Sequence, residues 1–444
     1  MAQCHCHWCN VFICLCAPCV FVALLVAYVH AMLMIGMQGK NLAIPLFVAR
    51  GLLENENFSS IPETFWDTHT NKNSIWNDLQ LLLDRRFNPI LLPNNTKKGF
   101  DPESLLSESL SASNNMRRHV EGLPQDLHNF LSSMHRRDYT TVLQPGGQCG
   151  AGGNDAAEQV LLLLAIKSKE PNFKNRQAIR QTWGRVGRVA GERGNHSSGG
   201  EGGGYVRRIF LLGKEEHEEH EKPAFGDYGL LQMESAYHGD ILQWDFKDTF
   251  FNLTLKDVLF WRWFSHTCNQ TLFVFKGDDD VFVNTQKMIA YLQGQLRAPQ
   301  TKESMNEFMV GEVFRSAAPH RVVDSKYYIP DSFYKGLYPL YAAGGGVLYS
   351  GLLAQRLHNV SKRVHLFPID DVYVGMCMFW LNAQPIHHPA FLTLDFPGKE
   401  EEQQCAYHSI LLVHRRSPEQ VIQLWDKLKR TRKQCRDVSL RVAN

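Results

Sequence analysis

Between residues 159 and 435, apolar residues gather in short runs that polar and glycine-rich stretches separate. Runs rich in aliphatic, β-branched and aromatic residues predict strands, and an uninterrupted run is typical of a strand covered on both faces. The predicted strands cover residues 160–166, 206–212, 240–246, 272–275 and 410–413. Predicted helices begin within 176–183 and cover 253–267. This alternation predicts an α/β fold with a mostly parallel sheet and helices on both faces.

The longest apolar stretch lies near the N-terminal end. Residues 11–37 are almost wholly apolar, and no Lys, Arg, Asp or Glu precedes Lys40. At ~1.5 Å per residue, a helix of this length crosses a bilayer core of ~30 Å, whereas a cleaved signal peptide is shorter and has a basic start. We therefore expect a signal anchor, although the tail has no basic residue to support the positive-inside rule. The alternative is a helix buried in a globular core.

This expectation divides the chain into four parts. They are a cytosolic tail (1–10), a transmembrane anchor (11–37), a luminal stem (38–138) and a luminal main domain (139–444). The stem is polar, with clusters of Asn, Ser and Pro that predict little regular structure. One amphipathic helix is predicted in it, and its apolar face comprises Trp76, Leu79, Leu82 and Leu83.

Composition narrows the function classes. The chain has 444 residues, of which 44% are hydrophobic and 21% charged, and its formal net charge is +2. No basic block with interleaved aromatic residues suggests nucleic acid as a partner. Six of the 11 cysteines precede residue 20; the other five are spread singly, which fits no zinc site but suits one or two disulfides with one thiol left over. Six Asn-x-Ser/Thr sequons, all after residue 37, agree with a luminal address.

An acidic triplet, Asp278 to Asp280, lies between the apolar run 272–275 and a second one at 281–283. Packing adjacent carboxylates between two buried strands is costly unless their charge is compensated. A hard divalent ion such as Mg²⁺ or Mn²⁺ on oxygen ligands provides that compensation. The alternative is a solvated acidic turn. Because ligands of open α/β sheets bind beyond the carboxyl ends of the strands, the triplet is well placed for a site.

Three further stretches carry candidate chemistry. Gly344, Gly345 and Gly346 precede a short strand, where glycines let a backbone approach a ligand closely; a β-bulge or turn is the alternative. Asp370 and Asp371 begin an apolar helix, where helix capping explains one carboxylate and leaves the other. His414 follows the strand 410–413 and is a candidate metal ligand, with a structural role as the alternative.

Nine blocks, in this order and spacing, resemble the β-1,3-glycosyltransferases of the Golgi, and among them most closely the β-1,3-N-acetylglucosaminyltransferases that extend poly-N-acetyllactosamine. The blocks are LLLLAIKS (161–168), NRQAIRQTWG (175–184), RRIFLLG (207–213), GDILQWDFKDTFFNLTLK (239–256), FVFKGDDDVFVN (273–284), KYYIP (326–330), YPLYAAGGG (338–346), FPIDDVYVGMC (367–377) and LLVH (411–414). The resemblance covers about residues 139–435 and is specific because nine blocks agree together.

The resemblance implies a GT-A fold, here a nucleotide-sugar-binding mixed sheet flanked by helices, with residues 139–444 as the catalytic domain. It also implies a UDP-sugar donor, a Mn²⁺ or Mg²⁺ cofactor and inversion at the anomeric carbon. On this likeness Asp280 is the direct metal ligand, Asp278 lies nearer the ribose, and His414 is the late histidine ligand. Asp371 is the catalytic base, with Asp370 as its neighbour. The residues implied near the donor are Arg176, Arg180, Lys276, Asp278, Asp279, Gly344, Gly345 and Gly346.

Several positions depart from the family pattern. Ala343 stands where glycine is usual and Glu312 where aspartate is usual, and Arg136-Arg137 occupies the place of a stem cysteine. These departures concern the choice of acceptor more than activity. Two disulfide candidates are Cys377–Cys405 and Cys149–Cys268.

The predicted reaction moves GlcNAc from UDP-GlcNAc to the 3-hydroxyl of a terminal galactose on a glycoprotein or glycolipid. Two alternatives remain: a β-1,3-galactosyltransferase that uses UDP-Gal, and a non-catalytic luminal partner of a related transferase. The expected location is the Golgi membrane, as a single-pass type II protein. Homo-oligomers and hetero-oligomers with other glycosyltransferases are both compatible with the sequence.

Overall fold

The computed structural model describes residues 74–87, 120–147, 149, 159–191, 203–215, 227–298 and 302–442. The chain divides into two compact units, 1–46 and 47–444, and every described residue belongs to the second. The predicted tail, the anchor at 11–37 and much of the stem lie outside the described residues. Within the described ranges, no helix is both long and apolar enough to cross a membrane.

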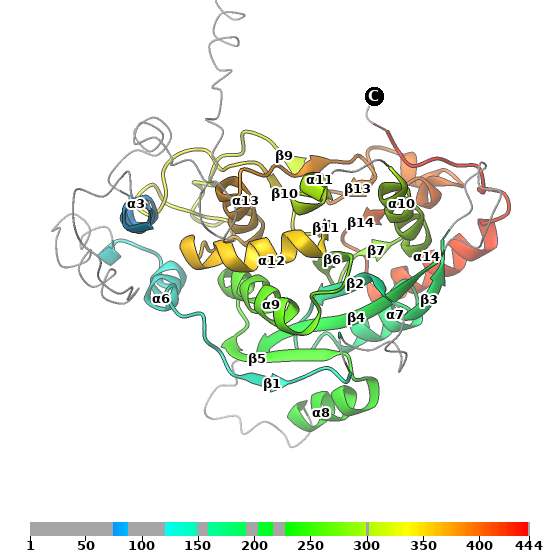
Figure 1. Cartoon of the computed structure of the whole chain (residues 1–444), viewed down its shortest axis with the longest axis horizontal. Helices are drawn as coiled ribbons and strands as arrows, with labels where there is room; N and C mark the ends of the chain where they lie inside the picture. Colours follow the sequence, from blue (N-terminus) through cyan, green and yellow to red (C-terminus); the bar gives the residue numbers. More distant parts are fainter. Residues whose placement is uncertain are drawn as a thin grey trace, which may run out of the picture. The chain divides into compact units, whose positions relative to one another are not determined.

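A mixed sheet of nine described strands forms the centre of the second unit (Figure 1). In spatial order the main path is β1 (Thr141–Leu143), β5 (Ile241–Lys247), β4 (Gly203–Lys214), β2 (Val160–Lys167), β6 (Phe273–Asp278), β11 (Gly346–Ser350), β8 (Met309–Gly311) and β12 (Ile386–His387). The four neighbours β5, β4, β2 and β6 are parallel, whereas β1 and β11 run antiparallel to their neighbours. β3 (Gly187–Ala190) pairs with β4 off this path.

Side chains of β2 alternate between two hydrophobic cores. Leu163 and Ala165 face a core that α9 (Leu253–Thr267), α12 (Gly351–Val360) and α13 (Asp370–Trp380) cover. Leu162 and Leu164 face a second core with residues from α7 (Phe173–Gln181), α10 (Thr285–Arg297) and α14 (Pro418–Thr431). Both faces of the strand are therefore buried, which explains its uninterrupted apolar run.

Smaller elements surround the sheet. A three-stranded sheet has the order β13 (Phe391–Leu392), β14 (Leu412–Val413) and β7 (Phe282–Val283), and β10 (Tyr341–Ala342) pairs with β9 (Val313–Phe314). The other described helices are α3 (Ile75–Phe87), α6 (Gln125–Ser133), α8 (Asp227–His238) and α11 (Lys302–Asn306). Short 3₁₀ turns are η1 (Phe250–Asn252), η2 (Ser361–Arg363), η3 (Glu400–Glu402) and η4 (Ala406–His408).

The predicted mixed α/β sheet with flanking helices is confirmed, but it is less parallel than expected, because β1, β3 and β11 pair antiparallel with their neighbours. The strands expected at 160–166, 206–212, 240–246 and 272–275 correspond to β2, β4, β5 and β6, and the helix expected at 253–267 is α9. α7 begins at Phe173, a few residues before the predicted start. The structure therefore follows the hydrophobic pattern most closely in the buried sheet.

The amphipathic helix predicted in the stem segment is α3, and it packs into the first core. Trp76 and Leu79 are each 2% exposed, and the indole N–H of Trp76 donates to the carbonyl of Leu366 at 3.1 Å. Leu82, predicted on the same face, is instead 36% exposed. Leu82 lies on the flank of the apolar stripe of this helix. Leu83, four residues after Leu79, lies closer to the middle of that stripe.

The disulfide prediction is half wrong. Cys149 pairs with Cys268, as predicted. The other predicted pair is absent: Cys405 pairs with Cys435, and Cys377 is a free buried thiol. Cys377 lies on α13 in the first core, whereas Cys435 and the η4 segment after Cys405 lie on the side of the second core. The central sheet separates Cys377 from Cys405.

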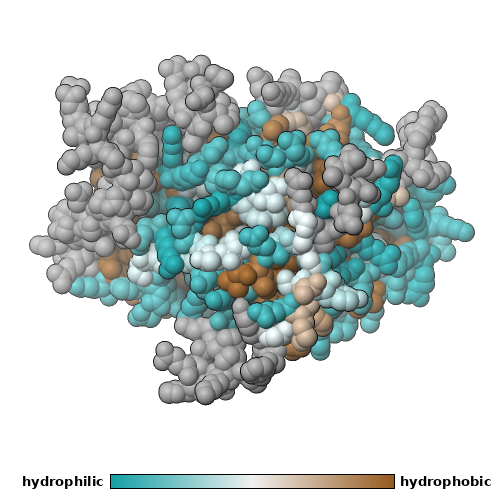
Figure 2. Space-filling view, turned by 60° about the horizontal axis from the view of Figure 1, so that its bottom comes forward, coloured by the Kyte–Doolittle hydropathy of each residue, from teal (hydrophilic) through white to brown (hydrophobic). Residues whose placement is uncertain are grey.

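The α8 helix contributes an exposed apolar strip. Leu230 is 58%, Met233 61% and Tyr237 85% exposed. Figure 2 turns the lower side of Figure 1 forward and shows hydrophobic side chains at the surface among hydrophilic ones. The three side chains line a cavity of about 1160 Å³ to which Arg176 also contributes.

Candidate active site

The predicted site residues converge at the carboxyl ends of β2 and β6. Lys167 ends β2 and pairs in register with Asp278, which ends β6. A cavity of about 630 Å³ opens at this edge, where open α/β sheets bind ligands. The predicted residues that line it are Asp278, Asp279, Asp280, Gly344, Gly345, Asp370, Asp371 and His414.

Two carboxylates and one imidazole form a group that suits a metal ion. Asp278, Asp280 and His414 each offer one ligand atom, and these atoms lie within 4.8 Å of one another. Nε2 of His414 is 3.1 Å from Oδ1 of Asp280 and 3.8 Å from Oδ2 of Asp278. Carboxylate-rich sites with one imidazole suit a hard or borderline divalent ion. The donor set therefore fits the predicted Mn²⁺ or Mg²⁺.

Hydrogen bonds orient the His414 ring toward the carboxylates. Its Nδ1 lies 3.2 Å from the carbonyl oxygen of Thr393, to which Nδ1–H can donate. Thr393 donates its backbone N–H to Oε2 of Glu312 at 2.7 Å, and its hydroxyl binds the same oxygen. Metal-binding histidines usually donate their second nitrogen in this way, which fixes the tautomer. Glu312, one of the departures from the family pattern, thus supports the metal candidate.

The middle carboxylate of the triplet has a different role. Oδ2 of Asp279 accepts hydrogen bonds from Ser168 Oγ at 2.6 Å and from Asn172 Nδ2 at 2.9 Å. Burial raises the pKa of Asp279 to about 6, although these two hydrogen bonds oppose the shift. The side chain points away from the metal candidates and ties the acidic turn to the loop after β2.

A buried lysine joins the two halves of the site. Nζ of Lys167 is 2.6 Å from Oδ2 of Asp370 and 3.1 Å from Oδ1 of Asp278. Burial alone would lower the pKa of Lys167, but the charges of Asp278 and Asp370 raise it well above its usual value. Lys167 therefore stays charged and fixes the acidic turn relative to the start of α13.

The pKa values of the two carboxyl groups that begin α13 are shifted in opposite directions. Burial would raise the pKa of Asp370, but the charges of Lys167 and Lys276 hold it below its usual range. Burial and the charge of Asp370 raise the pKa of Asp371 to about 7. Oδ2 of Asp371 accepts the backbone N–H of Gly344 at 3.0 Å, and the residue is partly exposed in the cavity. A carboxylate poised near neutral pH is suited to accept a proton.

The glycine stretch brings the two parts of the site close together. A Cβ atom on Gly344 would lie 3.4 Å from the Asp371 carboxyl carbon, and one on Gly345 would lie 3.1 Å from Nδ1 of His414. The predicted close approach of the backbone is present, and in the described structure it is made to Asp371 and His414. A Cβ on Gly344 would make ordinary van der Waals contact with Asp371, whereas one on Gly345 would require the His414 ring to shift by a few tenths of an ångström.

Besides Gly346, which begins β11, three residues implied near the donor do not line the cavity. Lys276 is buried and pairs with Asp257 at 2.6 Å. Arg176 and Arg180 lie in a buried ion-pair network with acidic residues of α8 and of the turn before β5. Arg176 reaches the site indirectly, because its guanidinium donates to Ser168 Oγ at 3.1 Å. It therefore positions the loop after β2.

Sequence reasoning missed several cavity residues. The sequence contains a signal that could have identified Lys167, because this lysine is the charged end of an otherwise apolar run. Arg415 is exposed, lines the cavity directly after His414 and has a positive φ of 61°. An aromatic wall also lines the cavity; its members are Phe250, Phe314, Tyr327, Tyr338 and Tyr341. Phe314 and Tyr341 stack at 5.6 Å through the β9–β10 pair.

Comparisons with known proteins agree with this geometry. The family model described as Galactosyltransferase matches residues 174–389. N-acetyllactosaminide beta-1,3-N-acetylglucosaminyltransferase 2 from Mus musculus is 40% identical over 386 residues, which cover 84% of this chain and 89% of that protein. The chain belongs to the β-1,3-N-acetylglucosaminyltransferase family. The resemblance drawn from the nine blocks is thereby confirmed.

Other members of this family are nearly as similar. UDP-GlcNAc:betaGal beta-1,3-N-acetylglucosaminyltransferase 7 from Rattus norvegicus is 38% identical over 314 residues, which cover 69% of this chain and 72% of that protein. Among solved structures, a bifunctional glycosyltransferase (WbbM) covers 60% of this chain and 47% of its own, at 11% identity and a TM-score of 0.31. A likeness that low carries no argument about fold or function.

Proposed function

We propose that this transferase moves GlcNAc from UDP-GlcNAc to the 3-hydroxyl of a terminal galactose, in β-1,3 linkage, and so extends poly-N-acetyllactosamine. The names of the relatives support the donor sugar and the linkage. One geometric observation carries the proposal: Asp371 shares a cavity with a metal-suited trio. Burial and the charge of Asp370 raise the pKa of Asp371 to about 7, which suits a base. The proposed setting is the luminal side of the Golgi membrane, as a single-pass type II protein.

The site residues divide the work of a single displacement. The acceptor 3-hydroxyl attacks the anomeric carbon, the bond from that carbon to the diphosphate oxygen breaks, and the hydroxyl proton passes to Asp371. Because Oδ2 of Asp371 already accepts the Gly344 N–H, Oδ1 is the oxygen left for that proton. General-base help of this kind is worth about 10²–10⁴ in rate. Attack from the face opposite UDP inverts the configuration, and one base suffices.

Asp278, Asp280 and His414 would hold the metal ion, which as a Lewis acid would neutralise the leaving diphosphate. Lys167 stays protonated and keeps Asp370 ionised beside the base, which in turn raises the proton affinity of Asp371. The aromatic wall provides flat apolar faces for sugar rings on the acceptor side. Asp279 and Arg176 hold the loop after β2 and do not contact the reacting atoms.

The deciding experiment incubates the purified protein from about residue 50 with Mn²⁺, a lactosamine acceptor and either UDP-GlcNAc or UDP-Gal. We expect GlcNAc transfer in β-1,3 linkage that EDTA abolishes. Transfer of galactose instead would keep the mechanism and replace the donor. Absence of metal-dependent UDP binding would overturn the proposal in favour of a non-catalytic partner.

A further inference from the structure

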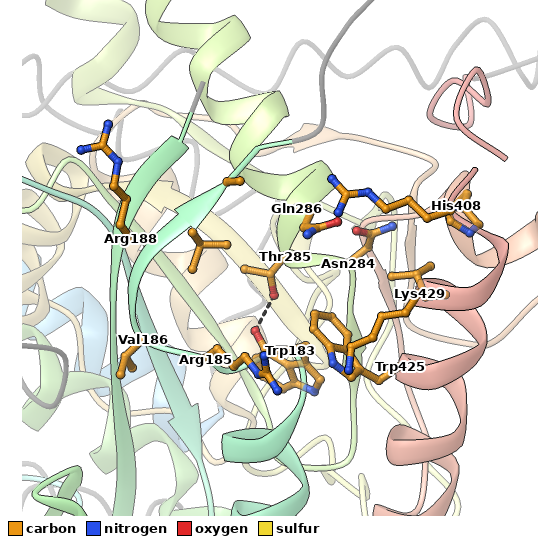
Figure 3. A pocket seen from close by; sticks show the side chains of 14 residues that line it. Trp183, Arg185, Val186, Arg188, Asn284, Thr285, Gln286, His408, Trp425 and Lys429 are labelled. Atoms are coloured by element: carbon orange, nitrogen blue, oxygen red, sulfur yellow. Dashed lines mark hydrogen bonds between the residues drawn. The ribbon is translucent and has the colours of Figure 1, made fainter. Parts of the chain in front are cut away.

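A second pocket, of about 430 Å³, lies on the side of the sheet that α10 and α14 cover (Figure 3). The segment after α7, strand β3, the start of α10 and the helix α14 all contribute to it. It shares no lining residue with the catalytic cavity. Asn284 in its wall is only four residues after Asp280, so the two sites are within about 14 Å along the chain. The pocket is a neighbour of the catalytic site and separate from it.

Its rim is basic. Arg185, Lys429 and Arg432 line it and are exposed, and no Asp or Glu is among the described residues that line it. Nζ of Lys429 lies 3.6 Å from Oδ1 of Asp426, and both side chains are more than half exposed. An exposed pair of that kind leaves the positive potential of the lysine largely available. A concave surface lined by one sign of charge concentrates ions of the opposite sign.

Two tryptophans form the inner wall and leave unused donors. Trp183 is 1% and Trp425 is 9% exposed. Neither indole N–H has a hydrogen-bond acceptor among the described residues, and both nitrogens are buried. A buried donor without a partner costs about 1–3 kcal/mol. Figure 3 shows the two side chains on the same side of the pocket, with Lys429 reaching toward the ring of Trp425; its Nζ is 5.5 Å from that ring.

The first turn of α10 adds a third source of positive potential. Asn284 caps this 13-residue helix by accepting the Lys287 N–H, and Thr285 and Gln286 lie in the pocket wall. The hydroxyl of Thr285 donates to the carbonyl of Trp183 at 2.5 Å, which fixes the helix start against the tryptophan. Helix N-termini attract anions through their free N–H groups and dipole.

We propose that this pocket binds a sulfate group, carried by a saccharide or free in solution. Residues that line it provide exposed cations, two buried indole N–H donors without an acceptor among the described residues, and a helix N-terminus, and all of them favour an oxyanion. The pocket has room for more than the oxyanion alone. The amide of Gln286 in the pocket wall suits the hydroxyls of an attached sugar. A sulfated saccharide is therefore the occupant that the lining fits best.

The test measures equilibrium dialysis of radiolabelled inorganic sulfate at constant ionic strength, with the full chain in detergent. The double variant Arg185→Gln, Lys429→Gln removes two rim cations. A matched control, Lys362→Gln with Lys399→Gln, removes two exposed lysines elsewhere. We expect one saturable site that weakens at least about tenfold in the pocket variant and stays unchanged in the control. No saturable site, or equal binding by both variants, would overturn the proposal.

A second arm distinguishes the source of the sulfate. A sulfated disaccharide and its unsulfated counterpart compete with the labelled sulfate. Tighter competition by the sulfated sugar than by inorganic sulfate supports a saccharide ligand. Competition no stronger than that of inorganic sulfate would show that the pocket binds the ion and does not recognise the sugar. Equal competition by the unsulfated sugar would contradict an anion site. Because the readout is binding alone, the result is independent of whether the catalytic proposal holds.

Discussion

Two clusters of charged residues lie beside the same sheet, and they differ in whether each charge has an oppositely charged protein group as its partner. The network beside β4 is closed: Glu234 and Asp240 are at most 2% exposed at their side chains and accept from Arg176, Arg180 and Arg208. The cluster at the carboxyl ends of β2 and β6 is open: five carboxyl groups line a cavity, and Lys167 and His414 are the basic residues that pair with them in the described structure.

The difference explains which predicted residues lie at the site. A charge whose partners are all protein groups stabilises a geometry and has nothing left to offer a ligand. In the open cluster Asp278 and Asp280 remain partly exposed and can bind a cation together with His414, and Asp371 has a pKa near 7. Arg176 and Arg180, which the family likeness places near the donor, belong to the closed network.

The largest effect should come from removing the base of the open cluster. Asp371→Asn keeps the size and the acceptor for the Gly344 N–H but cannot take a proton. We expect turnover to fall by about 10²–10⁴ while metal-dependent UDP binding persists, as measured by steady-state kinetics and by calorimetry. Turnover near that of the parent protein would refute the assignment.

Breaking the closed network should instead reduce stability. Asp240→Asn leaves the buried guanidinium groups of Arg180 and Arg208 without their shared carboxylate. Removing one partner of such a network costs about 3–5 kcal/mol, so urea unfolding should shift strongly while turnover per folded molecule changes little. Asp245→Asn in β5 is the matched control: its pair with Lys214 is exposed, so it should cost at most about 1 kcal/mol. Equal stability of the two variants would contradict the comparison.

The same contrast explains what the sequence could predict. The buried strands and the acidic turn after β6 are local patterns, so β2, β4, β6 and the metal trio were predicted from periodicity and from the blocks. The register between β2 and β6 brings Lys167 beside Asp278, and no local pattern encodes that neighbour. Charged residues therefore revealed where a site lies but not which partners they have.

Tertiary placement also explains why Arg176 and Arg180 do not line the cavity and why one disulfide prediction is wrong. Arg176 and Arg180 share one face of α7, but their partners come from α8 and from the turn before β5, more than 50 positions later. The pairing of Cys405 depended on which side of the sheet each cysteine lies. These facts follow from the packing of distant segments, which a single sequence does not state.

A smaller effect should follow removal of a metal ligand. Asp280→Ala deletes one carboxylate of the trio, and we expect metal-dependent UDP binding to weaken by at least about a hundredfold, beyond the 10–100-fold typical of groups that only support a ligand. Thr393→Val tests such a supporting group: it removes the hydroxyl bonded to Glu312 but keeps the carbonyl that His414 binds. It should therefore weaken metal-dependent UDP binding far less than Asp280→Ala does. Unchanged UDP binding in Asp280→Ala would remove this residue from the ligand set.

The smallest effect concerns pH. With a pKa near 7 for Asp371, kcat should fall about tenfold per unit as pH drops below that value, because only the ionised carboxylate accepts the proton. The pKa is raised relative to the unfolded chain, so Asp371 lowers the free energy of unfolding as pH rises from about 4 to 7. Asp371→Asn should therefore increase stability at pH 8 relative to the parent protein, and not at pH 4.

The neighbouring carboxyl group sharpens this last prediction. Asp370→Asn removes the like charge that helps to raise the pKa of Asp371, and it also frees Lys167 from its 2.6 Å partner. Both changes favour the ionised form of Asp371, so the acidic limb of the kcat profile should move to lower pH. A profile that keeps its midpoint, with activity otherwise measurable, would show that another group controls the limb. The open cluster would then need a different base, since Asp279 is tied to Ser168 and Asn172 and faces away from the metal candidates.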